Sequence, residues 1–309
     1  MVENLLLRKA TRVIFYSLLV ISFILLLNRL FLIFSYNLDL GGLENYFAFL
    51  ALKVGSGEMY THPEKYPFMV TQYPPLYLVL NHYLADVFNL YYKDMVRSIY
   101  VSGRLLNLIF NLVTIGVIFR FFRLQLKFTA QQSAIPALII FTLFIEHAYA
   151  VRMDSLKMLL VTCFYIVGYQ YLKDSKAKSL LIVVVVGFLA MIAKHDAALH
   201  VIVLGFVFFS QKQFLNAFKF GVPIAASFFG FGIVICGGSW EIFYQNFIVG
   251  ISQGVDFYWA NMVFKWNPFA MIAQLIMVVT LLIWGFRNKK KQWYLPTLIA
   301  FLFVFASFN

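Results

Sequence analysis

Long apolar runs recur along this 309-residue chain, and they limit its fold more than any other feature. Runs of about 17 to 25 residues are long enough to cross a bilayer core of about 30 Å as helices. Hydrophobic residues make up 62% of the chain and charged residues 12%, which excludes an ordinary soluble domain. We therefore predict an all-α fold, a polytopic membrane helical bundle.

The first apolar run, Ala10 to Phe34, is too long for a signal-peptide core and has no small-residue cleavage site after it, so we interpret it as a retained anchor. About nine crossings are expected in all. They lie near 10–34, 101–119, 134–149, 153–171, 180–192, 197–209, 220–236, 269–286 and 293–307.

Charge gives these crossings a direction, because short cytoplasmic loops accumulate Lys and Arg. With the N-terminus placed in the cytoplasm, the inner side holds 15 of the 25 basic residues but only Glu3 and Asp174 of the 13 acidic ones. The bases are spread over several short loops and form no continuous patch. This asymmetry favours a membrane origin for the formal charge of +12 and gives no reason to expect nucleic acid as a partner.

The run from Pro74 to Leu90 is apolar, yet it begins with two prolines and contains Asn81, His82 and Asp86. If it crossed the membrane, every later basic loop would face outward. We expect it to lie at the outer interface, with its tyrosines at headgroup depth. The outer side then carries a long first loop containing interfacial helices and a second segment, 237–268, rich in Trp and Tyr.

Several short motifs follow one another on the predicted outer face. They are Asp39-Leu-Gly-Gly-Leu-Glu44, Gly55-Ser-Gly-Glu-Met-Tyr60, Tyr73-Pro-Pro-Leu-Tyr77, Gly103-Arg104-Leu-Leu-Asn107, Arg152-Met-Asp154 and Ala193-Lys194-His195. In this order they resemble the outer motifs of GT-C glycosyltransferases. The likeness is greatest to the branch with aminoarabinose lipid A transferases, protein O-mannosyltransferases and uncharacterised bacterial relatives, and it covers residues 1–200.

The resemblance implies one transmembrane GT-C-like domain over 1–309, with 37–100 as its outer catalytic loop. Its activity would be inverting transfer of a sugar from a polyprenyl-phosphate-linked donor to an unknown glycan, lipid or protein acceptor. The expected location is a bacterial inner membrane, with the active site on the periplasmic face. Such a transfer needs a carboxylate that takes the acceptor proton and cations that stabilise the departing phosphate.

Asp39 and Glu44 are the two candidates for the catalytic base. Asp39 comes just after the first crossing, as the catalytic acid of the family does, but the spacing around the glycine pair differs. Asp39 could instead cap the following helix, and Glu44 could be a solvated helix acid. The sequence leaves the choice open.

Arg152 and Lys194 are the leading candidates for binding the donor phosphate, with Arg104 and His195 in support. Tyr73, Tyr77 and Asp154 are candidates for substrate contact. Asp154 could equally pair with Arg152 or Lys157. Each cation is predicted near an outer helix end, where long side chains reach the interface at low cost.

Neither a cofactor nor a metal is expected. The histidines have no metal-binding spacing, so we interpret His147 and His195 as hydrogen-bonded interfacial residues. Cys163 and Cys236 both lie in apolar runs and offer no disulfide framework. No glycine-rich nucleotide loop occurs, which fits a lipid-linked donor.

Two other classes of protein would also use such a bundle. A transporter of a lipid or small solute would employ buried charges for passage, although we find no internal repeat of the transporter kind. A non-catalytic GT-C-like subunit is the third option. Relatives carry further helices or an outer domain beyond the last predicted crossing, so the chain is either naturally short or lacks part of its acceptor-binding region.

Overall fold

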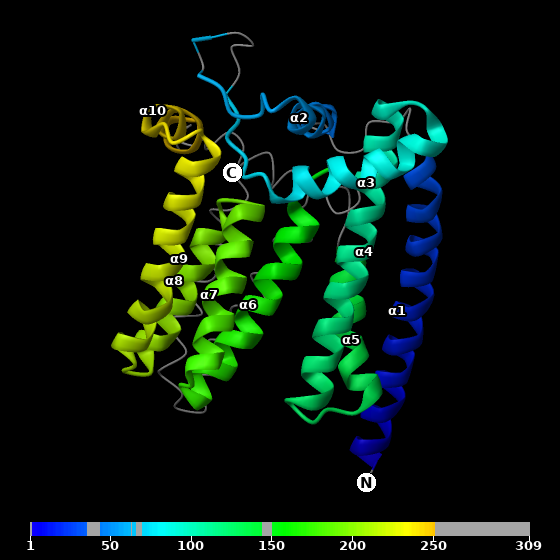
Figure 1. Cartoon of the computed structure of the whole chain (residues 1–309). Helices are drawn as coiled ribbons and strands as arrows, with labels where there is room; N and C mark the ends of the chain where they lie inside the picture. The colour runs from blue at the N-terminus through cyan, green and yellow to red at the C-terminus, as the bar shows by residue number, and fades with distance from the viewer. Residues whose placement is uncertain (1, 36–43, 63, 66–69, 144–149, 251–309) are drawn as a thin grey trace, which may run out of the picture. The chain divides into compact units, whose positions relative to one another are not determined.

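The computed structural model describes residues 2–35, 44–62, 64–65, 70–143 and 150–250 (Figure 1). These residues form helices joined by turns, with no strand among them. Asp39, the second outer segment beyond residue 250 and the crossings predicted at 269–286 and 293–307 lie outside the described residues. The all-helical fold class is confirmed for the part of the chain that is described.

The helices follow the apolar runs closely, with shifts of a few residues at their ends. They are α1 (Val2–Phe34), α2 (Glu44–Ser56), α3 (Leu76–Tyr92), α4 (Met95–Leu124), α5 (Ala130–Leu143), α6 (Asp154–Asp174), α7 (Ala177–Ala193), α8 (Ala197–Ser210), α9 (Phe214–Ile235), α10 (Trp240–Phe243) and the π-helical turn η2 (Tyr244–Val249).

Four of the described helices are long and apolar enough to cross a membrane. They are Thr11–Phe34 of α1, then α4, α6 and α9, and the apolar helices α7 and α8 are shorter. Side chains such as Val20, Phe23 and Phe31 of α1 are exposed, as expected for a surface that faces lipid. The chain is therefore an integral membrane protein.

The chain divides into two compact units. Unit 1 contains residues 1–59 and 75–166, and unit 2 contains residues 60–74 and 167–309. The motif Tyr73-Pro-Pro-Leu-Tyr77 includes the point at which the chain passes from unit 2 back to unit 1.

In unit 1 the helices α1, α4 and α5 run in alternating directions. The side chain of Arg104, early in α4, reaches the carbonyl oxygens of Leu32 and Ser35 at the end of α1. Arg29, late in α1, donates to the carbonyl of Phe141 near the end of α5. Both α1 and α5 therefore end where α4 begins, as the charge pattern predicted.

Helix α3 lies across the beginning of α4 (Figure 1) and packs against it, with hydrogen bonds from Tyr77 to Gly103 and from Ser102 to Asn81. Because α1 ends and α4 begins at the same end of unit 1, the chain between them makes no net crossing. Helix α3 begins directly after Pro75 and ends at Tyr92, and the next residue, Lys93, caps it in a left-handed conformation. Asp94 then caps α4 by accepting a hydrogen bond from the backbone N–H of Arg97.

In unit 2, the helices from α6 to α9 also alternate. Tyr171 near the end of α6 donates to Asn216 near the start of α9, and its ring lies against Phe208 near the end of α8. Helices α7 and α9 therefore begin at the end of unit 2 where α6 and α8 finish. The basic residues Lys173, Lys176 and Lys212 gather at that end, and the motif residues of unit 2 lie at the opposite end.

Candidate functional site

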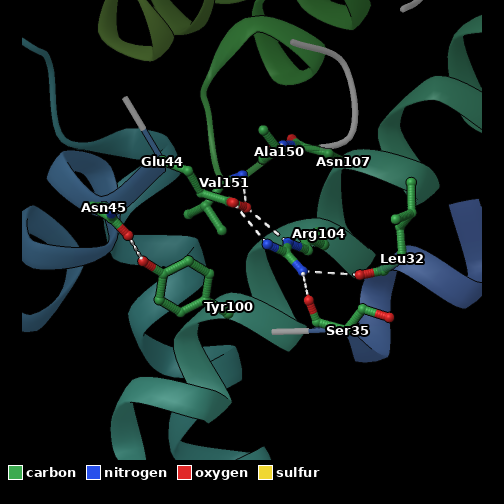
Figure 2. Close-up of polar contacts among 9 residues, drawn as sticks. All are labelled: Leu32, Ser35, Glu44, Asn45, Tyr100, Arg104, Asn107, Ala150 and Val151. Carbon is green, nitrogen blue, oxygen red and sulfur yellow. Dashed lines mark hydrogen bonds and ion pairs between the residues drawn. The ribbon is translucent and has the colours of Figure 1, made fainter. Parts of the chain in front are cut away.

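A buried ion pair between Glu44 and Arg104 forms the centre of the polar cluster in unit 1 (Figure 2). Arg104 Nε lies 2.8 Å from Glu44 Oε1, and Arg104 Nη2 lies 2.7 Å from Glu44 Oε2. Both side chains are 0% exposed. This is the two-pronged geometry in which a guanidinium binds a carboxylate most strongly.

The same guanidinium also binds the end of α1. Its Nη1 donates to the carbonyl oxygens of Leu32 at 2.9 Å and Ser35 at 3.0 Å. These carbonyls lie at the C-terminal end of α1, where a cation is favourable, and the Leu32 carbonyl also accepts from the backbone N–H of Ser35. Arg104 therefore joins the end of α1 to Glu44, the first residue of α2.

Asn107, one turn further along α4, holds the segment that precedes α6. Its amide nitrogen donates to the carbonyl oxygens of Ala150 and Arg152 and to the Tyr77 hydroxyl (Figure 2 shows the bond to Ala150). The backbone N–H of Val151 donates to Glu44 Oε1 at 2.8 Å. Two side chains of α4 thus connect α1, α2 and the start of α6.

Gly103 lets these segments approach α4. A Cβ atom at this position would lie 2.8 Å from Asn81 Nδ2, 2.9 Å from Val151 Cγ1 and 3.0 Å from the Tyr77 hydroxyl. The Tyr77 hydroxyl donates to the Gly103 carbonyl, and burial raises the pKa of this hydroxyl well above its ordinary value of 10. Tyr77 therefore stays protonated and acts as a hydrogen-bond donor.

Arg152 and Asp154 lie beside this cluster and keep some exposed surface. Arg152 Nε lies 3.1 Å from Asp154 Oδ2, and the side chains are 15% and 25% exposed. The guanidinium carbon of Arg152 lies 5.7 Å from the centre of the Phe47 ring. The predicted pairing of Arg152 with Asp154 is thus present. Of the predicted phosphate-binding residues in unit 1, Arg152 is accessible and Arg104 is not.

In unit 2, the predicted residues Lys194 and His195 lie in the turn between α7 and α8. Lys194 Nζ is 3.6 Å from Asp196 Oδ2, with both side chains less than one fifth exposed. The ring of His195 lies 6.1 Å from that of Tyr73, centre to centre. A cation, an imidazole and an aromatic ring therefore lie together at this end of unit 2.

Asn246 of η2 holds the segment that carries Tyr73. Its Oδ1 accepts from the backbone N–H of Thr71 at 2.7 Å, and its Nδ2 donates to the Thr61 carbonyl at 3.2 Å. The Tyr60 hydroxyl donates to the carbonyl of Tyr73 itself at 2.7 Å. The structure thus gives Asn246 a part in fixing the 60–74 segment.

The predicted site residues therefore form two groups. Unit 1 brings together Glu44, Tyr77, Arg104, Arg152 and Asp154, and unit 2 brings together Tyr73, Lys194 and His195. The convergence of both groups on one pocket stays a prediction, as does the role of Asp39 outside the described residues. Within the described part of the chain, no three His, Cys, Asp or Glu side chains form a metal-binding group; His147 lies outside it.

Arg29 was not among the functional residues predicted from the sequence, although it is a charged residue inside an apolar run. It is 2% exposed within the spanning part of α1. Its Nη2 donates to the Phe141 carbonyl at 3.2 Å, and its guanidinium carbon lies 4.3 Å from the centre of the Phe141 ring. Charges at this depth are costly and tend to be functional. The apolar run was interpreted only as an anchor, so this signal was not used.

Comparison of the chain with protein-family models, with curated proteins and with solved structures finds no match.

Proposed function

We propose that this protein is an inverting membrane glycosyltransferase that moves a sugar from a polyprenyl-phosphate carrier to an acceptor. The observation that supports this most is the gathering of Glu44, Arg104, Arg152 and Asp154, distant in sequence, at one end of the spanning helices of unit 1. Lipid-linked chemistry requires charged groups at a membrane surface, and the apolar spans provide the surface that a polyprenyl chain needs.

The solvent exposure of each charged or polar side chain decides the role that we propose for it. Arg152 of unit 1 and Lys194 of unit 2 both keep some exposed surface, and each is a candidate for the donor phosphate, where positive charge stabilises the leaving group. His195 and Tyr73 would contact the donor beside Lys194. Arg104 and Tyr77 are fully buried, so we assign them to holding the site rather than to binding substrate. Asp154 would orient Arg152.

The basic ends of the helices support the proposed orientation. Arg104 and Arg123 are separated along α4 by about 29 Å at 1.5 Å per residue, which is close to the thickness of the hydrocarbon core. If Arg123 faces the cytoplasm, as the distribution of Lys and Arg suggests, the polar cluster of unit 1 faces the outer side. A bacterial inner membrane with a periplasmic site remains our proposal.

The test is transfer by the purified protein in nanodiscs supplied with a radiolabelled polyprenyl-phosphate sugar. We expect release of free lipid phosphate or labelling of an acceptor, with loss of this activity in Asp39→Asn. Arg152→Gln and Lys194→Gln should weaken use of the donor. Asn28→Leu, which alters an exposed polar residue of α1, serves as the matched control. Equal activity in the wild type and in Asp39→Asn would exclude Asp39 as the base.

Buried polar residues within the spans favour one competing function. Arg29 and Ser22 of α1 and Asn111 and Thr114 of α4 are all buried, as transport pathways through helical bundles require. A transporter would show flux of a lipid or solute in sealed liposomes without cleavage of a glycosidic bond. Arg29→Leu should then abolish flux, whereas a transferase would retain bond cleavage that depends on Asp39.

A further inference from the structure

We infer that the exposed face of α10 and η2 in unit 2 is a binding site for a sugar ring. Two aromatic rings and one carboxylate share this face: Trp240, Tyr244 and Glu241 are 57%, 43% and 69% exposed. Positions three and four apart are neighbours on a helix, so Glu241 and Trp240 both lie next to Tyr244. The inference rests on the proposed function, for which it names the acceptor as a glycan.

The two exposed rings are held in place from below by buried ones. The Trp240 ring lies 5.5 Å from the Phe243 ring and 6.2 Å from the Tyr244 ring, centre to centre. Phe243 is fully buried and stacks on the Phe247 ring at 5.3 Å. Gly232 of α9 makes room for Phe243, because a Cβ atom there would overlap its ring. The exposed rings therefore form a fixed platform, which reduces the entropy lost when a ligand binds.

The carboxylate beside the rings is oriented by an imidazole of the same unit. His62 Nε2 lies 3.1 Å from Glu241 Oε1. His62 Nδ1 accepts from the backbone N–H of Glu64 at 3.3 Å, so Nε2 carries the proton and donates it to the Glu241 hydrogen bond. Asn246 of η2 fixes the residue before His62, because its Nδ2 donates to the Thr61 carbonyl. Glu241 is thus directed at one oxygen, while most of its side chain stays open to a ligand.

Tryptophan and tyrosine also gather at membrane interfaces, where they serve as anchors without a ligand. The exposed face of α10 and η2 differs from such an anchor because it carries the Glu241 carboxylate and the His62 imidazole. A carboxylate in hydrocarbon is costly, so we expect this face to lie in water. Exposed rings that lie together in water mark a binding surface.

The groups on this face match the two kinds of surface on a sugar. A pyranose ring presents C–H groups on its faces and hydroxyl groups around its rim. The C–H groups fit the electron-rich faces of Trp240 and Tyr244. The hydroxyls fit Glu241, because an ionised carboxylate accepts several hydrogen bonds and accepts them more strongly than a neutral oxygen does.

Glycan binding by the full chain tests the site without any transfer chemistry. Wild-type protein in nanodiscs is passed over an array of immobilised glycans, and we expect retention on at least one of them. Trp240→Ala and Glu241→Gln should each weaken this retention about tenfold, because a stacked ring or a hydrogen bond to a charged group contributes about that much. Trp240→Phe keeps a ring and should bind within about threefold of the wild type. Retention on no glycan, or equal retention in Trp240→Ala, overturns the inference.

Matched variants of unit 1 serve as controls for the substitutions themselves. Tyr83→Ala is compared with Tyr244→Ala, and Glu58→Gln with Glu241→Gln, since all four side chains are exposed. Both unit 1 variants should keep the retention of the wild type, and equal losses in the two units would contradict a site on this face. Release of the retained protein by choline chloride, but not by the soluble form of the glycan, would identify an ammonium ligand and overturn the sugar assignment.

Hydroxyl-radical footprinting in nanodiscs reports whether water or lipid covers the rings. Trp240 and Tyr244 should be oxidised in the free protein and protected several-fold by the retained glycan. Phe23, an exposed side chain in the spanning part of α1, should stay unoxidised because lipid covers it. Rings as unreactive as Phe23 would belong to a membrane anchor, and the inference would then be wrong.

Binding and transfer can fail separately. If the wild type binds a glycan through Trp240 but transfers no sugar, the site stands and the transferase proposal falls. If the wild type transfers sugar while Trp240→Ala leaves the apparent KM for the acceptor unchanged, the transferase proposal stands and the site falls. Because Trp240 and Glu241 are both exposed, their variants should elute from size-exclusion chromatography as the wild type does.

Discussion

The polar ends of the two units hold their charges in different ways. In unit 1, Glu44 and Arg104 are fully buried, and backbone groups complete their hydrogen bonds. In unit 2, Lys194 and Asp196 are partly exposed at 3.6 Å, and the neighbouring 60–74 segment is held by the neutral amide of Asn246. Buried charges of this kind organise a framework, whereas partly exposed ones remain available to a ligand.

The largest loss of stability is expected when the buried Glu44–Arg104 pair of unit 1 is broken. Arg104→Gln leaves Glu44 as an uncompensated buried charge, which should lower the free energy of unfolding by about 3–5 kcal/mol. The double variant with Glu44→Gln should recover much of this loss. Denaturant unfolding in detergent micelles measures both. If the double variant is as unstable as the sum of the two single variants, the pair contributes nothing as a pair.

The next largest loss of stability is expected at Asn107, the second side chain of α4 that holds other segments. Asn107→Leu removes the donor for the carbonyls of Ala150 and Arg152, and should cost about 1–3 kcal/mol in the free energy of unfolding. Asn28→Leu, the same change at an exposed position of α1, should cost little or nothing. Thermal unfolding of the two variants provides the comparison. Similar melting temperatures would contradict a special role for Asn107.

Asn246, the residue of unit 2 with a similar role, should contribute somewhat less to stability. Asn246→Leu removes two hydrogen bonds to the 60–74 segment, those to Thr71 and Thr61, against the three that Asn107 makes to other segments, so we expect about 1–2 kcal/mol. Hydrogen exchange of the backbone should quicken at Thr71 while remaining slow in α4. An even increase across both units would mean that Asn246 supports the whole protein and not the 60–74 segment alone.

The smallest effect comes from a partly exposed ion pair within unit 1. Lys53 Nζ lies 2.6 Å from Glu58 Oε2, and the hydrogen bond and charge of Lys53 lower the pKa of the Glu58 carboxyl below its ordinary value of 4.5. A lowered pKa in the folded state contributes stability above the unfolded value, and this contribution is lost as the pH falls through the folded value.

Lys53→Met should therefore slightly reduce the pH dependence of stability between about pH 5 and pH 3, because exposed ion pairs contribute little. Melting temperatures of the variant and the wild type across this range provide the measurement. A loss of stability in Lys53→Met as large as that in Arg104→Gln would show that burial does not explain the difference between the Lys53–Glu58 and Glu44–Arg104 pairs.

Much of the fold could be predicted from the sequence. Helix α4 was expected at 101–119 and extends over Met95–Leu124, and the run from Pro74 to Leu90 was expected to form an interfacial helix, where the structure has α3 over Leu76–Tyr92. These features follow from hydropathy, proline position and charge, which are local properties. The ends of helices were less well predicted, since capping residues such as Asp94 extend a helix beyond its apolar run.

The candidate site was predicted only in part. The types of residue and the end of each helix on which they lie followed from motif order and charge. Glu44 was considered as a base or a solvated acid, and nothing in the sequence pointed to its bonds with Arg104 and Val151. Those partners lie 60 and 107 positions away in the chain.

The sequence by itself determined that this is an all-helical membrane protein. It also determined the alternating direction of the helices and the helix ends at which the polar residues gather. Each depends on the free energy of placing a residue in lipid or water, which a local stretch of sequence sets. Only the tertiary structure decided which charges are paired and buried and which stay accessible, because pairing depends on the packing of segments that meet only when the chain folds. Arg104 and Arg152 carry the same charge in the sequence, and their burial alone separates them.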